Sequence, residues 1–373
     1  MTLQSIKNVD ENLDDYVSCD YIVVGAGVSG LTAAQALQSA GKNVCVFEKA
    51  RGTGGRLGSK RVSFENENQQ GGFDLGASAF CAKTELFKNY LGELQALNKV
   101  TLVDPVASSY VAEPRNSALT RHMSNSLNVN FSEKISRIEF KNDKWFLFCQ
   151  TQTDARQPQA SRSDEFVMAC CHHLILAMPA EQASALLPAG HVAESWIAHT
   201  ESDPVFVSCF IFPYGSMSVS DLLSINQFSS DVIANISLEH LKPGRNLTEF
   251  PMIKVTSTCG WAKQHLDKHF DDIASYLFQD LNKQFSLNGI ATPDYLKQYT
   301  HRWLYSQYSN LIKGTKGYLS FSDGIHIVGD YFDVQTDIEG QPIDGVERAF
   351  LSAHKLVEHL AEQSQYALSS KVK

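Results

Sequence analysis

Residues 21–48 read YIVVGAGVSGLTAAQALQSAGKNVCVFE, and this stretch decides the fold. Its first four residues are apolar and mostly β-branched, which is typical of a buried parallel strand. The pattern G-x-G-x-x-G follows at Gly25, Gly27 and Gly30. Residues 31–40 favour a helix that ends at Gly41, and residues 44–47 favour a second strand that ends in an acid. The stretch therefore predicts a βαβ unit.

Each glycine of this unit has a physical task. Gly25 permits the tight turn from strand to helix, Gly27 lets the backbone approach a pyrophosphate, and Gly30 allows close packing of helix on strand. The amino end of the helix, at Val28 and Ser29, offers free N–H groups to phosphates. Glu48 can accept hydrogen bonds from both ribose hydroxyls. A glycine turn without a ligand is the alternative, but the complete set favours a dinucleotide site.

The loop after Glu48 distinguishes between dinucleotides. It runs from Lys49 to Gly54-Gly55-Arg56, a glycine-rich segment directly after the ribose-binding acid. This loop resembles the G-G-R segment of the amine oxidase and renalase superfamily of FAD proteins. The resemblance implies that FAD is the cofactor and that the loop runs along its pyrophosphate and ribitol. A flexible turn without a ligand is the alternative.

A second signal lies near the carboxyl end of the chain. Residues 324–330 predict a strand that ends in Gly329-Asp330, and Gly345-Val346 open a helix that runs to about Leu360. This arrangement resembles the second flavin motif of the same superfamily. It implies that the acid binds a ribityl hydroxyl and that the helix amino end faces the flavin N1 region, where negative charge develops on reduction. An ordinary loop acid is the alternative.

Three further segments narrow the resemblance to renalase-like flavoproteins. They are Phe73-Asp74-Leu75-Gly76-Ala77 at the predicted flavin edge, residues 241–245 (LKPGR) and residues 301–305 (HRWLY). The resemblance covers roughly residues 20–360. It implies an oxidase that takes hydride from isomers of reduced nicotinamide dinucleotides and passes electrons to oxygen. Residues 113–119 and 256–261, around Arg115 and Cys259, depart from the family pattern on the substrate side.

The substrate side offers candidate residues rather than a motif. Arg245, Lys242 and Arg302 are candidate contacts for substrate phosphates, with surface charges or interdomain ion pairs as the alternative. His301 and Trp303 are candidates for residues that border the flavin, and core packing is their alternative.

Two other functions stay open. Many amine oxidases of the superfamily hold a lysine near the flavin, and Lys254 in a predicted strand is the candidate, although a strand lysine that reaches solvent is more ordinary. An amine oxidase or a desaturase-like enzyme with a small organic substrate is thus the second hypothesis. A non-catalytic FAD-binding protein is the third.

The predicted fold class is α/β, a two-domain flavoprotein with a discontinuous Rossmann-like FAD domain and a smaller substrate domain with a mixed α+β sheet. The FAD domain is expected to take residues 19–75, 105–185 and 300–365, and the substrate domain residues 76–104 and 186–299. The expected FAD contacts are Gly25, Gly27, Val28, Ser29, Gly30, Glu48, Lys49, Gly54, Gly55, Arg56, Gly76, Ala77, Ile135, Gly329, Asp330, Gly345 and Val346.

Composition excludes several classes of partner. The chain has 373 residues, enough for about two domains. Its net charge of −9 disfavours nucleic acid and anionic lipid, and no apolar run reaches the ~20 residues that span a bilayer. The eight cysteines are scattered without a C-x-x-C pair, which favours free thiols in a cytoplasmic protein. No metal-ligand spacing is present, and no metal is expected. The resemblance implies a small-molecule substrate and molecular oxygen as partners.

Overall fold

The central sheet contains the predicted βαβ unit. The computed structural model of the protein describes residues 16–63, 70–150, 165–223, 230–245, 249–334 and 343–370. β1 (Val17–Val24) leads through the glycine turn into α1 (Val28–Ser39), and β2 (Val44–Glu48) returns parallel to β1. The sequence prediction for this unit is confirmed element by element.

The order of the strands in this sheet is that of a Rossmann fold. β8 (Asn128–Phe131), β2, β1, β11 (Glu165–Leu176) and β17 (Ile325–Ile327) are parallel neighbours in that order. This is the 3-2-1-4-5 order of a doubly wound sheet. β16 (Leu319–Ser320) extends it beyond β17, antiparallel to that strand. Ligands bind such sheets beyond the carboxyl ends of the strands, where the strand order reverses between β1 and β11.

One local prediction was wrong. The apolar runs at residues 129–131, 135–140 and 144–149 predict an antiparallel meander, which the structure shows only in part. β9 (Ile135–Lys141) and β10 (Lys144–Gln150) are antiparallel and extend the amino half of β11. Residues 128–131, however, form β8 and pair in parallel with β2. The apolar pattern of a short strand does not show which neighbour it pairs with.

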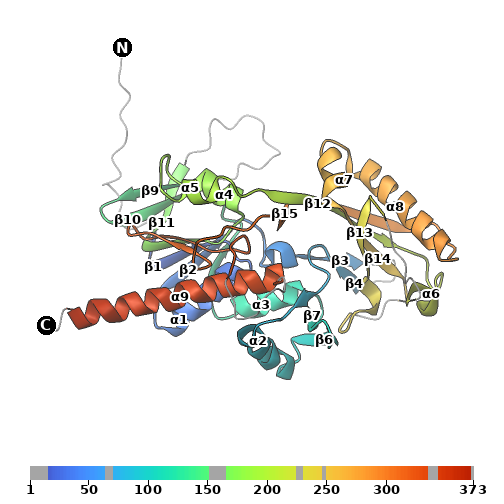
Figure 1. Cartoon of the computed structure of the whole chain (residues 1–373), viewed down its shortest axis with the longest axis horizontal. Coiled ribbons are helices and arrows are strands. Elements are labelled where there is room, and N and C mark those ends of the chain that lie inside the picture. The colour runs from blue at the N-terminus through green and yellow to red at the C-terminus, as the bar shows by residue number, and fades with distance from the viewer. Residues whose placement is uncertain are drawn as a thin grey trace, which may run out of the picture.

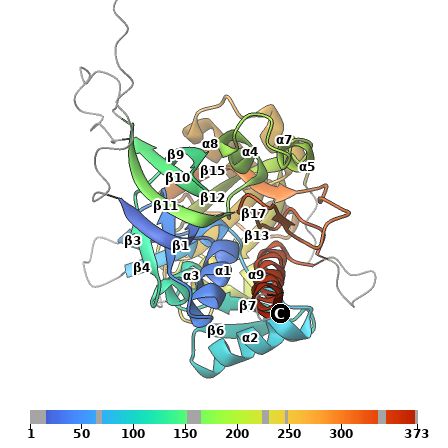
Figure 2. The same cartoon turned by 90° about the vertical axis from the view of Figure 1, so that its left-hand side faces the viewer.

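Helices cover one face of the central sheet, and a second apolar layer covers the other. Tyr21 and Val23 point to the face packed by α1, α2 (Glu85–Ala96), α3 (Ser117–Ser124) and α9 (Gly345–Ser370). Ile22 and Val24 point to the opposite face, against β9, β10, α4 (Ala180–Leu186) and α5 (Glu194–Ile197). This alternation is that of a strand buried on both sides. Figure 2 shows α1 and α9 on one side of β1 and β11, with α4 and α5 on the other.

A second, antiparallel sheet forms the other lobe (Figure 1). Its order is β13 (Ile233–Leu238), β14 (Met252–Ser257), β12 (Ser202–Ile211) and β15 (Lys297–Tyr308). α7 (Cys259–Gln264) and α8 (Phe270–Leu287) pack on one face, and α8 confirms the helix expected from residue 269 to 285. The hairpin of β3 (Ser59–Ser63) and β4 (Gln70–Asp74) packs on the other face.

Short elements complete the described chain. They are a 3-10 turn η1 (Gly55–Leu57), a small sheet of β5 (Phe80–Cys81), β7 (Ser109–Ala112) and β6 (Val100–Asp104), α6 (Val219–Leu223) and a 3-10 turn η2 (Glu239–Leu241).

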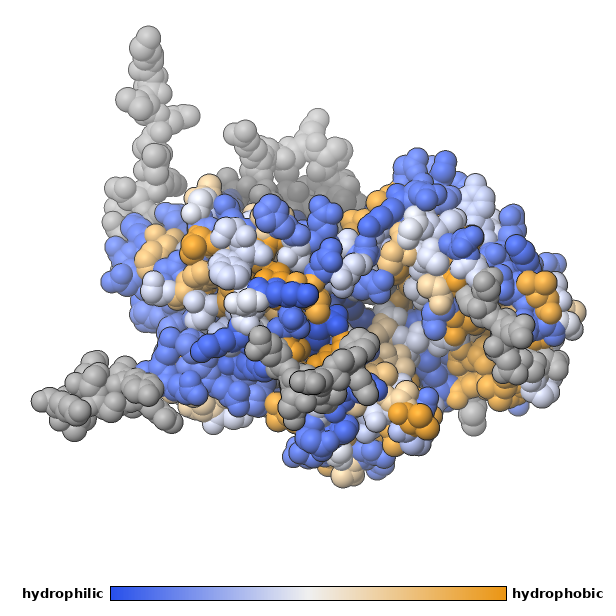
Figure 3. Space-filling view, in the orientation of Figure 1, coloured by the Kyte–Doolittle hydropathy of each residue, from blue (hydrophilic) through white to orange (hydrophobic). Residues whose placement is uncertain are grey.

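The hydrophobic cores divide the chain differently from the expected domain boundaries. Residues 76–104 were assigned to the substrate domain, but Phe87 of α2 packs in the core of the Rossmann lobe, with its ring centroid 5.0 Å from that of Phe350. Ile197 also packs with the Rossmann lobe, although 186–299 was assigned to the other. Residues 300–365 were assigned to the FAD domain, but β15, which contains the first of them, belongs to the antiparallel sheet of the other lobe. Figure 3 shows the surface hollowed where the two lobes meet.

Candidate functional site

Packing within the protein explains two of the three glycines in the turn. A Cβ on Gly25, whose φ is +113°, would lie 2.3 Å from the carbonyl oxygen of Ala177. A Cβ on Gly30 would lie 2.0 Å from the carbonyl oxygen of Gly25. A Cβ on Gly27 would meet no atom within 4 Å. Packing within the protein therefore does not require a glycine at position 27, and the space beside it is open to a ligand.

The amino end of α1 is open in the same place. Gly27 is its N-cap and provides no side-chain hydrogen bond, and no acid lies in its first turn, where Val28 and Ser29 stand. Unsatisfied N–H groups and the positive end of the helix dipole attract an anion there. The open Cβ position and the uncapped helix end together fit a dinucleotide pyrophosphate.

The acid at the end of β2 is held against this turn. Glu48 accepts hydrogen bonds from the backbone N–H groups of Ala26 and Ala50, each 2.8 Å long. The two bonds fix the carboxylate beside the glycine turn, and each oxygen keeps a lone pair for a ribose hydroxyl.

Two of the expected cofactor contacts have side chains that are engaged elsewhere in the protein, and their contact with a cofactor stays a prediction. The amino group of Lys49 binds Gln182 of α4 at 3.1 Å on an exposed surface. Ile135 is buried in the apolar layer beneath the sheet. The sequence position of these residues next to the motif did not show the direction of their side chains.

The glycine-rich loop after β2 lies on the turn. The N–H of Gly54 donates to the carbonyl of Ala26, and a Cβ on Gly55 would lie 3.6 Å from the Cα of Gly27. Arg56 then points away from the turn. Its two terminal nitrogens bind the two carboxylate oxygens of Asp330 at 2.7 and 2.6 Å. The sequence predicts that this guanidinium contacts the cofactor. In the structure, the guanidinium is already engaged in an ion pair with Asp330.

Asp330 brings the carboxyl-terminal motif to the same place. Its side chain is buried, and a Cβ on Gly345, the first residue of α9, would lie 3.3 Å from its Oδ2. The N–H of Gly329 donates to Ser352, which lies inside α9. The amino end of α9, with Val346 in its first turn, thus starts beside Asp330 as the sequence predicted. Two motifs from opposite ends of the chain meet through Arg56.

The F-D-L-G-A segment closes one side of this arrangement. A Cβ on Gly76 would lie 1.7 Å from the carbonyl oxygen of Arg56, and the N–H of Ala77 donates to that oxygen at 3.0 Å. The indole of Trp303 donates to the carbonyl of Leu75 at 2.9 Å. Trp303 therefore contacts the F-D-L-G-A segment, and its expected place at the border of the flavin stays a prediction.

The two neighbours of Trp303 in β15 differ in placement. The ring of His301 contacts that of Trp303 edge-on, with centroids 4.5 Å apart, and burial together with the nearby Lys60 lowers the pKa of His301. Arg302 donates to the carbonyl of Leu266 at 2.6 Å, on the α7–α8 connection. Of these two residues, His301 is thus the one that contacts Trp303.

A buried charge cluster that sequence reasoning missed lies behind Gly76. Asp74 and Glu239, both fully buried, bind the cations Lys242 and Arg245. Arg245 also donates to the carbonyls of Ala112 and Pro114. The expectation that Arg245 and Lys242 contact substrate phosphates is therefore corrected, because their charges are neutralised inside the protein. Asp74 belongs to the Phe73–Ala77 segment that the sequence singles out, whereas no sequence pattern points to Glu239.

Lys254 connects this cluster to the glycine-rich segments. It is fully buried in β14, and its ammonium donates to the carbonyl of Gly76 at 2.8 Å. The carboxylate of Glu239 lies 3.9 Å away. Burial lowers the pKa of Lys254 to about 8, while the nearby Glu239 opposes that shift. Lys254 is thus an ammonium that can lose its proton near neutral pH, beside a segment expected to touch the flavin.

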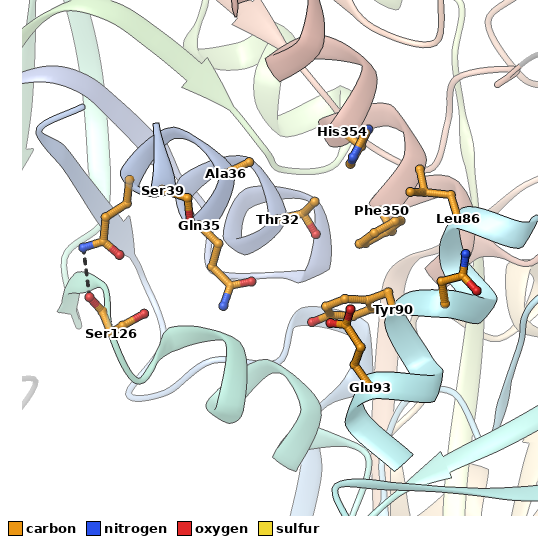
Figure 4. A pocket seen from close by; sticks show the side chains of 12 residues that line it. Thr32, Gln35, Ala36, Ser39, Leu86, Tyr90, Glu93, Ser126, Phe350 and His354 are labelled. Atoms are coloured by element: carbon orange, nitrogen blue, oxygen red, sulfur yellow. Dashed lines mark hydrogen bonds between the residues drawn. The ribbon is translucent and has the colours of Figure 1, made fainter. Parts of the chain in front are cut away.

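A separate groove of about 470 Å³ lies between three helices of the Rossmann lobe (Figure 4). Gln35 of α1, Tyr90 and Glu93 of α2, and Phe350 and His354 of α9 line it. None of the expected cofactor contacts lines this groove, so it is distinct from the predicted flavin site.

Within the described ranges no helix is both long and apolar enough to cross a membrane. The same residues contain no group of three or more His, Cys, Asp or Glu side chains placed to hold a metal ion.

Comparison with known proteins agrees with this geometry. Residues 23–94 match a family model described as an NAD(P)-binding Rossmann-like domain. Cyclohexylamine oxidase from Brevibacterium oxydans IH-35A is 13% identical, with a TM-score of 0.59 over 93% of this chain and 99% of that chain. Putrescine oxidase bound to putrescine is 12% identical, with a TM-score of 0.63 over 93% and 100%. A protein assigned as a protoporphyrinogen oxidase from Exiguobacterium sp. 255-15 is 11% identical, with a TM-score of 0.63 over 93% and 99%.

At these identities the likeness shows the fold. Residues 23–94 thus match a Rossmann-like family model, and the chain shares the overall fold of these two amine oxidases. The fold class predicted from the sequence is confirmed.

Proposed function

We propose that this protein is an FAD-dependent oxidoreductase. The observation that carries the proposal is the convergence of four segments on one place. Hydrogen bonds, an ion pair and close backbone contacts join the open Gly27 turn, the Glu48 carboxylate, the Gly54–Arg56 loop and the Asp330–Gly345 junction, although these segments come from both ends of the chain. The first two fit either NAD or FAD, and the other two favour FAD, because they resemble the segments that hold the flavin half of the cofactor in the amine oxidase and renalase superfamily.

The residues present fit FAD. The uncapped end of α1 would hold the pyrophosphate, Glu48 the adenosine ribose, and Asp330 a ribityl hydroxyl beside the amino end of α9. Bound FAD would supply the hydride acceptor, which is chemistry that side chains lack. The positive end of α9 would stabilise negative charge there, and Trp303 would shield that region from water.

The space at Gly27 gives a sharp test. A Gly27→Ala variant adds a methyl that touches no protein atom, and the φ of −84° suits alanine, so the stability of the cofactor-free protein should not fall. The methyl would occupy the path of the pyrophosphate, so FAD affinity should fall at least about tenfold, or about 1.4 kcal/mol. Gly92→Ala, in the interior of α2 with equally open space, is the matched control; it should leave FAD affinity unchanged and raise stability slightly, because alanine favours a helix more than glycine does.

FAD titration followed by flavin fluorescence measures the affinity, and urea unfolding of the cofactor-free protein measures stability. Equal FAD affinity in the Gly27 and Gly92 variants would contradict the assigned site. Purified protein that takes up no FAD would contradict the proposal as a whole.

As substrate we propose a reduced nicotinamide dinucleotide isomer, with oxygen as the electron acceptor. The renalase-like segments support this choice. A cationic group also supports it, because Arg61 and Arg121 lie near enough to Arg115 to lower its pKa, after the larger effect of burial. No ion pair of these three arginines with an acid is seen within the described parts of the chain. Anaerobic mixing with those isomers should bleach the visible flavin band, and an unchanged spectrum would refute this substrate.

An amine substrate is the second candidate, and two observations favour it. Putrescine oxidase and cyclohexylamine oxidase share the fold. The buried Lys254, with a pKa of about 8, could take up a proton as an amine is oxidised. Peroxide formation that depends on putrescine or cyclohexylamine would support this candidate over the first. Protein that binds FAD but turns over neither class would support the non-catalytic alternative, and the cytoplasmic location stays a prediction.

A further inference from the structure

Two cysteine thiols are in direct contact at the start of the nucleotide-binding unit. The sulfur of Cys19 on β1 lies 2.7 Å from the sulfur of Cys45 on β2, and both side chains are buried. That separation is less than 1 Å longer than the ~2.05 Å of a disulfide bond. Other free cysteines of the described chain lie in other layers or on other strands.

An irregularity in β1 makes the contact possible. The carbonyl of Asn43 accepts hydrogen bonds from the N–H groups of both Asp20 and Tyr21. Two residues of β1 therefore share one partner on the neighbouring strand, as in a β-bulge. Cys19 consequently lies in the same apolar layer as Cys45, on the face that also holds Ile22.

The surroundings prepare Cys45 to be the reacting sulfur. The amide of Asn128 on β8 donates to its sulfur at 3.2 Å, and the Cys19 thiol donates from the other side. The hydrogen bond from Cys19 lowers the pKa of Cys45 to about 7, against burial and with help from Asn128. A thiolate is the nucleophilic form of cysteine. Cys171, opposite Cys19 on β11, is different, because burial raises its pKa.

The pair is almost closed off from solvent, with Cys45 only 2% exposed, so an oxidant that reaches it must be small. Cys19 lies near the amino end of β1, between the exposed residues Ser18 and Asp20, and is itself 5% exposed. Hydrogen peroxide is little larger than water. A protein that acts as a flavin oxidase would itself produce peroxide. The oxidation requires only that peroxide from some source be present.

We propose that Cys19 and Cys45 are an oxidation site that forms a disulfide between β1 and β2 on exposure to hydrogen peroxide. The Cys45 thiolate attacks one oxygen of the peroxide, so that an S–O bond forms, the O–O bond breaks and hydroxide leaves. The sulfur of Cys19 then attacks the oxidised sulfur of Cys45, and the S–O oxygen leaves as water with the Cys19 proton. Two thiols lose two electrons in total, and one peroxide becomes two waters.

The crosslink encloses the complete glycine turn and α1. It joins positions 26 residues apart, so it reduces the freedom of the unfolded βαβ unit. The oxidised protein should therefore unfold at a higher urea concentration than the reduced protein, and a reducing agent should reverse the shift.

Thiol counting on the intact protein with its cofactor tests the proposal. After peroxide treatment, unfolding and alkylation, two fewer than the eight cysteines should carry the label. Trypsin cuts between the two residues at Lys42, so mass spectrometry should find peptides 8–42 and 43–49 joined. Cys45→Ser should lose no labelled thiol on oxidation, and Cys19→Ser should lose at most one, as the sulfenic acid of Cys45 that has no partner to form a disulfide. Cys209→Ser, a buried cysteine of the other lobe, should still lose two.

Several results would overturn the proposal. They are full alkylation of all cysteines after peroxide, a disulfide that maps to Cys170 or Cys171, and oxidation that stops at sulfinic or sulfonic acid. The peptide mapping uses the unmodified protein, so the test does not depend on whether a serine variant folds.

Discussion

The bidentate ion pair between Arg56 and Asp330 should be a main connection between the two ends of the chain at the proposed flavin site. We predict that Asp330→Asn, which keeps the shape and removes the charge, lowers the free energy of unfolding by about 2–3 kcal/mol. Removing one partner of a buried pair typically costs about 3–5 kcal/mol. The side chain of Asp330 is 6% exposed but that of Arg56 is 32% exposed, so solvent screens part of the interaction.

A double-mutant cycle separates the pair from other effects. Arg56→Met, Asp330→Asn and the double variant should give a coupling free energy of about 1.5–2.5 kcal/mol in urea unfolding. The matched control is Arg137 with Glu165, which are 2.9 Å apart but 44% and 29% exposed and should give less than about 0.5 kcal/mol. Equal coupling in the two pairs would refute the reasoning. Each Arg56 or Asp330 variant should also release FAD faster than the control variants, as measured by flavin fluorescence.

Three further predictions concern packing and protonation. Gly76→Ala places a methyl 1.7 Å from the carbonyl oxygen of Arg56, so urea unfolding should show a loss of about 3 kcal/mol, and an unchanged midpoint would contradict this packing. Burial lowers the pKa of His326 to about 3 from its usual 6.5, so the unfolded chain binds a proton that the folded chain does not, and acid destabilises the fold. Between neutral pH and about pH 5, the free energy of unfolding should therefore fall by about 2 kcal/mol less in His326→Gln than in the unchanged protein. Substrate turnover should show an inflection near pH 8 that Lys254→Met lacks; an inflection that persists belongs to another group.

The sequence by itself determined the nucleotide-binding unit. The strand, the three glycines, the helix and Glu48 lie within residues 21–48, and their geometry depends on close neighbours along the chain. Gly25 and Gly30 illustrate the reason, because the φ of Gly25 is +113° and a Cβ on Gly30 would lie 2.0 Å from the carbonyl oxygen of Gly25 in the same turn. Local backbone geometry can be read from residue type, so this part of the site was predictable.

The sequence also indicated that Gly329-Asp330 belongs with the glycine-rich loop, but only through a resemblance. The contact that joins them, between residues 274 positions apart, depends on how the sheet and α9 pack. The same holds for Cys19 and Cys45, since their contact needs an irregular β1 that no residue pattern showed.

Only the tertiary structure decided which charges face inward. Lys242 and Arg245 flank a glycine-containing turn and look like surface cations, yet they neutralise Asp74 and Glu239 inside the protein. A buried charge needs a partner, and that partner comes from another strand or turn brought near by folding. The apolar face of α2 likewise fits either core, and only packing against Phe350 placed it in the Rossmann lobe. Local pattern sets the elements of this protein, and long-range packing selects their partners.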